Sequence, residues 1–103
     1  MEVNITKDNW VDEVENCKDT VIVDFYGTWC VPCKMLAPIV EKVASDKNIK
    51  LAKVDIDENE ELIRKFKIMS VPTLKFFKDG AEVSSSVGLI SENRLNEIID
   101  NLK

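Results

Sequence analysis

Two cysteines stand three residues apart in the segment Trp29-Cys30-Val31-Pro32-Cys33-Lys34. Residues at this spacing on a first helical turn lie about 5 to 6 Å apart, inside the range of about 4.4 to 6.8 Å that a disulfide tolerates. The N-terminus of a helix also favours an anion and lowers the pKa of a thiol placed there, and the thiolate is the nucleophile of disulfide exchange. The segment therefore predicts a pair that opens and closes a local disulfide.

The two cysteines are expected to do different work. We expect Cys30, at the exposed lip of the helix, to attack a substrate disulfide. Cys33 lies one turn further in and is expected to be more buried, so that it resolves the mixed disulfide by attacking the sulfur of Cys30. Pro32 fits an early helical position, where its missing amide costs little, and it limits how far the thiols separate.

Other uses of the pair fit less well. On the chain-entropy model, a structural disulfide across residues 30–33 contributes only about 2 kcal/mol, less than half the value for a loop of about 100 residues. A zinc site needs four ligands, but the chain has three cysteines and no histidine, so zinc would require carboxylates or a second chain. Inert core cysteines fit poorly with a position between a strand and a helix. We expect no metal.

Composition excludes several other classes of function. The 103 residues are 45% hydrophobic and 32% charged, which predicts one domain over residues 1–103. A net charge of -5 argues against nucleic acid, since binding phosphates needs a surplus of Lys and Arg. The three glycines form no nucleotide-binding loop, and no apolar run approaches the ~20 residues that span a bilayer, so no membrane association is expected. The first residues carry acids where a signal peptide is apolar, which predicts a cytoplasmic location.

The elements around the pair alternate strand and helix. Residues 21–26 are β-branched and aromatic almost throughout, which is typical of a central strand covered on both faces. A helix is expected over residues 33–46 and a parallel strand over residues 51–56. This order places the cysteine pair at the carboxyl end of the central strand, where open α/β sheets hold their active sites.

The rest of the chain completes an α/β fold. The first helix is expected over residues 8–16, with Trp10, Val11 and Val14 as its apolar face. The remaining elements are a strand at residues 3–5, a helix at 60–66, a hairpin of strands 73–78 and 81–87 joined through Asp79-Gly80, and a last helix capped by Ser91. The order predicts a three-layer sandwich, a central mixed sheet of about five strands flanked by about four helices.

The cysteine segment, preceded by Val23-Asp24-Phe25, resembles the active site of the thioredoxin family, Trp-Cys-Gly-Pro-Cys-Lys after a buried Asp. The resemblance spans essentially the whole chain through Lys53 before Val54-Asp55-Ile56-Asp57, Val71-Pro72-Thr73-Leu74, Lys78-Asp79-Gly80, and Gly88 before the last helix. It implies the thioredoxin fold and a monomeric dithiol carrier that transports electrons and reduces disulfide-containing proteins. It also implies recharging by a thioredoxin reductase of unspecified type, without a bound cofactor.

The resemblance implies roles for residues outside the motif. Asp24, an acid within an apolar strand, is similar to the family's buried acid that moves the proton of Cys33, and Lys53 resembles its partner on the neighbouring strand. Pro72 is expected in cis facing the cysteines, with Val71 offering its backbone to an extended substrate segment. The substrate-docking collar is expected to comprise Trp29, Val71, Pro72 and Gly88. From the residues alone, the alternatives are an exposed Asp24, an exposed Lys53 and an ordinary half-buried Trp29.

Several positions depart from the family pattern. Val31 replaces Gly and stiffens the loop, which leaves the reduction potential open, while the absence of His at Pro32 favours a reducing role. Tyr26 replaces a common Trp, and we expect little effect. Cys17 matches no motif and is expected to be a buried, inert thiol, the alternative being an exposed thiol that oxidises into dimers. Two rival functions are a binding module without turnover and an oxidising or isomerising relative.

Overall fold

Strand β2 (Thr20–Tyr26) runs through the middle of a five-stranded sheet in the computed structural model, which describes residues 1–102. The strand order is β1-β3-β2-β4-β5. On one side, β3 (Lys50–Asp55) is parallel to both β2 and β1 (Glu2–Asn4). On the other side, β4 (Thr73–Lys78) is antiparallel to both β2 and β5 (Ala81–Val87). The expected mixed sheet is confirmed.

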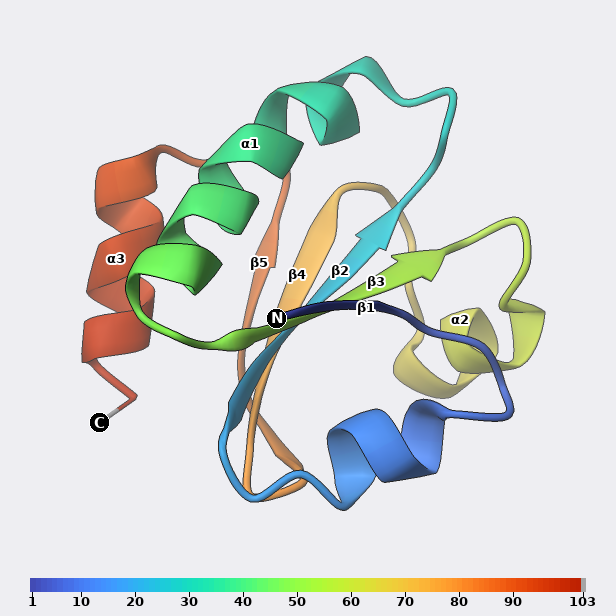
Figure 1. Cartoon of the computed structure of the whole chain (residues 1–103). Coiled ribbons are helices and arrows are strands. Elements are labelled where there is room, and N and C mark those ends of the chain that lie inside the picture. The colour runs from blue at the N-terminus through green and yellow to red at the C-terminus, as the bar shows by residue number, and fades with distance from the viewer. Residues whose placement is uncertain (103) are drawn as a thin grey trace.

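Helices cover both faces of this sheet (Figure 1). Helices α1 (Val31–Asp46) and α3 (Glu92–Asp100) lie on one face. Helix α2 (Glu60–Phe66) and a short π-helical segment, η1 (Val11–Glu15), lie on the other. Each pair of helices closes its own apolar core against the sheet, which gives the three layers expected from the sequence. No helix within residues 1–102 is long and apolar enough to cross a membrane.

Strand β2 contributes to both cores because successive side chains of a strand point to opposite faces. Ile22 belongs to the core under α1 and α3. By the same alternation, Asp24 and Tyr26 lie on the α1 face. The other core, under η1 and α2, takes the alternate residues Val21, Val23 and Phe25.

The first helix differs from its prediction. Asn16 donates its backbone N–H to the carbonyl oxygen of Val11 at 2.8 Å, an i to i+5 bond that defines a π-helical turn. Trp10 and Val14 are buried as expected, but Val11 is 50% exposed. Residues that are adjacent in a helix point in different directions, whereas residues four apart share a face. Val11 therefore points away from the buried face that Trp10 and Val14 form.

The start of α1 also lies earlier than expected, at Val31 in place of Cys33. The side chain of Cys30 accepts a hydrogen bond from the backbone N–H of Cys33, which satisfies an amide that the first helical turn leaves free. The helix therefore begins directly after Cys30. The strands predicted at residues 3–5 and 51–56 each lie one residue earlier in the structure.

The hairpin and the last helix follow their local signals. Asp79 and Gly80 have φ values of 53° and 80°, as a two-residue hairpin turn of this kind requires. A Cβ atom at Gly80 would also lie 2.3 Å from the carbonyl oxygen of Glu15. Both the positive φ and this close contact therefore favour glycine at position 80. Ser91 caps α3 by accepting the N–H of Arg94 at 3.1 Å, as predicted.

Candidate redox site

A disulfide joins Cys30 and Cys33 where β2 passes into α1. Their Cα atoms are 5.2 Å apart. Cys30 is the N-cap residue of α1, and its Sγ accepts the N–H of Cys33 at 3.2 Å. Pro32 occupies the first turn, as expected. In the reduced form, this N–H and the helix dipole favour a thiolate on Cys30.

The expectation that Cys30 is exposed and Cys33 more buried is wrong for the disulfide-bonded protein. Each cysteine is 5% exposed. Cys30 is covered by the segment before Pro72, where the Val71 carbonyl oxygen lies 3.8 Å from its Sγ, and the Val71–Pro72 bond is cis as the resemblance implied. The two sulfurs differ in their neighbours and not in their exposure.

The residues expected to form the docking collar differ in exposure. Trp29 is 62% exposed, so the alternative of an ordinary half-buried aromatic is wrong. Val71 and Gly88 are half-buried, whereas Pro72 is buried and its carbonyl oxygen accepts the N–H of Gly88 at 2.8 Å. Pro72 thus lies beneath this surface, and Val31, which is 63% exposed, extends it at the mouth of the helix.

Two neighbours hold the Trp29 side chain. Its indole Nε1 donates a hydrogen bond to Oδ2 of Asp57 at 3.0 Å. The ring also lies against Gly27, where a Cβ atom would come within 2.8 Å of it. Neither neighbour was given a role from the sequence, although Asp57 stands in the segment Val54-Asp55-Ile56-Asp57 that contributes to the family resemblance. A signal existed for Asp57, because it follows the end of β3 and the carboxyl ends of parallel strands meet at one edge of the sheet.

A cavity of about 230 Å³ lies behind the disulfide, between β2, β3 and α1. Asp24 and Lys53 reach it from the face of the sheet that α1 covers, and Cys33 reaches it from the helix. The structure therefore brings together three residues that the sequence named separately. The full lining is Asp24, Tyr26, Gly27, Thr28, Cys33, Lys34, Ala37 and Lys53.

Asp24 is a buried acid, so the alternative of an exposed strand end is wrong. It is 3% exposed, and its Oδ1 has no hydrogen-bond partner. Burial raises the pKa of this carboxyl from 3.8 to about 6, against a lowering by Lys53, while the nearby charges of Glu41 and Glu2 raise it further. A carboxyl with this pKa can take up or release a proton near neutral pH.

Lys53 lies next to Asp24 across the parallel pairing of β2 and β3. Its side chain is only 17% exposed, so the exposed alternative is wrong. Its Nζ is 3.9 Å from Oε2 of Glu41 and 5.0 Å from the centre of the Tyr26 ring. Within residues 1–102, no ion pair joins Lys53 directly to Asp24.

From the sequence, Tyr26 was expected to have little effect on the site, and Glu41 was not identified. Signals for both exist. Tyr26 stands two residues after Asp24 in a strand, so the two side chains point to the same face. Glu41 follows Cys33 and Ala37 at a spacing of four, which aligns the three on one stripe of a helix.

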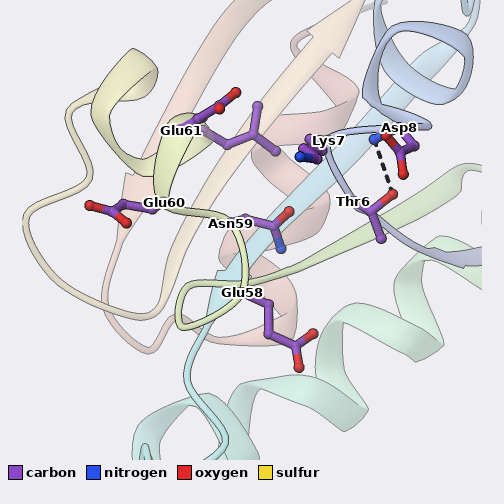
Figure 2. Close-up of a pocket in the computed structure, with 8 residues that line it drawn as sticks. Thr6, Lys7, Asp8, Glu58, Asn59, Glu60 and Glu61 are labelled. Carbon is purple, nitrogen blue, oxygen red and sulfur yellow. Dashed lines mark hydrogen bonds between the residues drawn. The ribbon is translucent and has the colours of Figure 1, made fainter.

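A second cavity, of about 370 Å³, lies between the loop before η1 and the start of α2 (Figure 2). Its wall includes the acids Asp8, Glu58, Glu60 and Glu61, but Figure 2 shows the three Glu carboxylates pointing in different directions. No three His, Cys, Asp or Glu side chains in the described residues are placed to hold a metal ion. The cavity contains no sulfur, so the disulfide and its own cavity remain the candidate site.

Cys17 is a free cysteine that lies before β2, at the end of the strand opposite Cys30. It is half-buried and packs against the core under η1 and α2. The expectation of a buried thiol is therefore met only in part. Its position separates it from the chemistry of the disulfide.

Comparison with known proteins gives a consistent match. The family model for thioredoxin matches residues 2–101. The chain is 42% identical over 100 residues to a thioredoxin of Staphylococcus saprophyticus, covering 95% of this chain and 94% of that protein. It is 41% identical over 103 residues to a thioredoxin of Rickettsia bellii, covering 98% of each chain. A solved structure of a mutant thioredoxin from Halobacterium salinarum matches with a TM-score of 0.89 at 38% identity, covering 97% of this chain and 88% of that chain.

Proposed function

Since the chain belongs to the thioredoxin family and is therefore a dithiol protein-disulfide reductase, we propose that Cys30 and Cys33 carry the electrons of its reaction. The observation that carries this proposal is the cysteine pair at the N-terminus of α1, with Cys33 open to the cavity that holds Asp24. Membership implies two kinds of partner, disulfide-containing proteins and a reductase that recharges the dithiol. No bound cofactor is needed, because the electrons reside in the two sulfurs.

The reaction begins from the reduced pair. The Cys30 thiolate attacks one sulfur of a substrate disulfide and forms a mixed disulfide, while the other substrate sulfur leaves as a thiolate. Cys33 then attacks the Sγ of Cys30, which closes the internal disulfide and releases the second substrate sulfur. The substrate gains two electrons and the pair loses two.

Asp24 is the base that we assign to the second step. Cys33 must lose its proton before it attacks, and both side chains line the same cavity. With a pKa of about 6, the Asp24 carboxyl is mostly ionised at neutral pH and can accept this proton. The positive charge of Lys53 favours the ionised form, which is the role we assign to it.

Substrates are proposed to dock on the exposed surface around Cys30. Trp29 supplies apolar area, and the backbone of Val71 pairs with an extended substrate segment in the manner of a strand. Gly88 allows close approach, and Pro72 supports the surface from below. Val31 and Pro32 lie between the thiols, and we assign to them the tuning of the reduction potential, in favour of reduction.

We further propose that the protein is an electron carrier of the cytoplasm and that it acts as a monomer. Residues 1–103 are proposed to form one thioredoxin domain. The unpaired Cys17 supports a reducing compartment, because secreted proteins rarely leave a cysteine free. Light scattering on the reduced protein checks the monomer: a mass of twice 11.7 kDa would contradict it.

The assay of choice is reduction of insulin disulfides with dithiothreitol as the electron source. We expect the parent to accelerate the reaction, Cys30→Ser to abolish the acceleration, and the matched control Cys17→Ser to retain it. Cys33→Ser should accumulate a mixed disulfide with the substrate, visible as an adduct by mass. If Cys30→Ser works as well as the parent, the pair does not carry the electrons.

The direction of the reaction needs a separate measurement. Equilibration in a glutathione redox series, with the oxidation state of Cys30 and Cys33 read by mass, gives the potential. A value near about -270 mV supports a reductase, and one near about -120 to -180 mV indicates an oxidising or isomerising relative. A domain that only binds partners would show neither turnover nor any effect of Cys30→Ser.

A further inference from the structure

The Lys53 ammonium is held between two groups, neither of which is Asp24. One is the carboxylate of Glu41, at 3.9 Å, and the other is the face of the Tyr26 ring, at 5.0 Å from its centre. The lysine side chain is only 17% exposed, so its charge stays at the cavity and does not extend into solvent. An ammonium within about 6 Å of a ring centre is attracted by the negative face of the ring.

We propose that Tyr26 is a positioning residue, whose ring holds the Lys53 ammonium beside the cavity behind Cys33, near Asp24 but out of a direct ion pair with it. The inference rests on the proposed function, since it concerns the group that takes the Cys33 proton. The proposal gives the Tyr26 ring a role in the reaction, whereas the replacement of the family's common Trp by Tyr26 was expected to have little effect.

The arrangement of the strands explains why the ring is in this place. Asp24 and Tyr26 are two residues apart in β2 and point to the same face, and Lys53 is paired with Asp24 across β3. The lysine stem therefore leaves the sheet beside the acid, and its ammonium lies over the ring, 5.0 Å from the ring centre. Since the ring attracts the ammonium without neutralising it, Asp24 feels a positive charge but keeps an unpartnered oxygen that can receive a proton.

The charged and titratable groups around Asp24 lie on α1, β3 and β1, and on β2 itself, where Tyr26 carries a phenol. Helix α1 contributes Glu41 and, in the reduced protein, the thiol of Cys33; β3 contributes Lys53; β1 contributes Glu2. Lys34 lines the same cavity from α1. Strand β4 places Leu74, which does not titrate, opposite Asp24. Of these groups, the positive charge of Lys53 is the one that Tyr26 can move.

The test follows the titration of the Asp24 carboxyl by carbon NMR in the oxidised protein, in which neither site thiol titrates. We expect Tyr26→Leu to let the Lys53 ammonium move away from Asp24 and to raise the affinity of Asp24 for its proton about threefold, because the Coulombic attraction by which Lys53 lowers the pKa of Asp24 weakens with distance. Tyr26→Phe keeps the ring and should restore the parent midpoint. Tyr26→Met gives a second variant without a ring in case Tyr26→Leu does not fold.

A lysine background separates positioning from packing. In Lys53→Met the charge is absent, so adding Tyr26→Leu should leave the Asp24 midpoint where Lys53→Met alone puts it. An equal shift in both backgrounds, no shift, or a fall in proton affinity for Tyr26→Leu would each overturn the inference. Insulin reduction by the parent is measured in parallel, so that an inactive parent counts against the proposed function, whereas an active parent without the coupling counts against Tyr26 alone.

Discussion

On the η1 and α2 side of β2, Phe25 packs into an aromatic cluster with Trp10, Phe66 and Phe77, whose ring centres lie 5.2 to 6.1 Å apart. One residue earlier, on the α1 side, Asp24 has a buried oxygen with no partner beside a cavity. The first face is dominated by buried aromatic and aliphatic side chains, and the second holds a buried titratable group beside a cavity. Both belong to the same strand.

The difference teaches how a small domain keeps stability and chemistry apart. A buried carboxyl opposes folding when it is ionised, whereas buried aromatic rings favour it. Because strand side chains alternate between faces, β2 can carry both without placing the acid in the aromatic core. Removing the Phe25 ring from one face and the Asp24 carboxyl from the other should therefore change stability in opposite directions.

The largest expected effect is on the aromatic face. Phe25→Ala removes a fully buried ring and should lower the free energy of unfolding by about 3 to 5 kcal/mol. Urea unfolding at neutral pH measures this, and Phe25→Leu is the matched control with a smaller loss. A loss below about 1 kcal/mol in Phe25→Ala would mean that this face does not supply the stability.

The next effect, of opposite sign, is on the cavity face. The pKa of Asp24 is about 6 in the folded protein against an ordinary 3.8, so the folded state binds the proton more tightly than the unfolded state. Below the ordinary pKa both states are protonated; as pH rises through about 6, the folded state loses up to about 3 kcal/mol relative to a chain without this acid.

Asp24→Ala removes this penalty. Its free energy of unfolding should exceed that of the parent by more at about pH 8 than at about pH 4, while insulin reduction slows by up to about 100-fold for lack of the base. Urea melts at both pH values, taken as the difference between variant and parent, cancel the titration of all other groups. A variant that is clearly less stable than the parent at neutral pH would contradict the burial argument.

A smaller effect is expected at the hydrogen bond between Trp29 and Asp57, on the surface where substrates are proposed to dock. Asp57→Ala removes the acceptor of the Trp29 indole and should loosen the ring, with a loss of about 1 kcal/mol or less in stability and a few-fold fall in turnover. The difference in tryptophan fluorescence anisotropy between the proteins reports the mobility of Trp29, since the buried Trp10 contributes equally to all of them, and Asp57→Asn, which keeps an acceptor, should stay close to the parent. Equal anisotropy in all three proteins would show that the hydrogen bond does not hold the ring.

The smallest effect is expected at Cys17, which packs at the margin of the apolar core under η1 and α2. Cys17→Ser should change the free energy of unfolding by less than about 1 kcal/mol and leave turnover unaltered. Non-reducing gels should show monomers for both proteins. A dimer band that is present in the parent and absent from Cys17→Ser would support the exposed, oxidisable thiol instead.

Local patterns in the sequence determined the elements and the place of the chemistry. The β-branched run of β2, the Asp79-Gly80 turn, the Ser91 cap and the spacing of Cys30 and Cys33 each act through neighbours within a few residues, so they can be read from the chain. The same patterns predicted the mixed sheet and the position of the cysteine pair at the start of α1. The exposure of Val11 was not foreseen, because the sequence did not show that the buried face of this short helix includes Trp10 and Val14 but not Val11.

Only the tertiary structure decided how distant residues share one space. The equal burial of Cys30 and Cys33 depends on the Val71 segment, which is remote in the chain and covers Cys30. The position of the Lys53 charge depends on Glu41 and Tyr26, from two other elements, and the proton affinity of Asp24 depends on burial by all of them. Electrostatic energies are set by distance and desolvation, and neither quantity exists until the chain has packed.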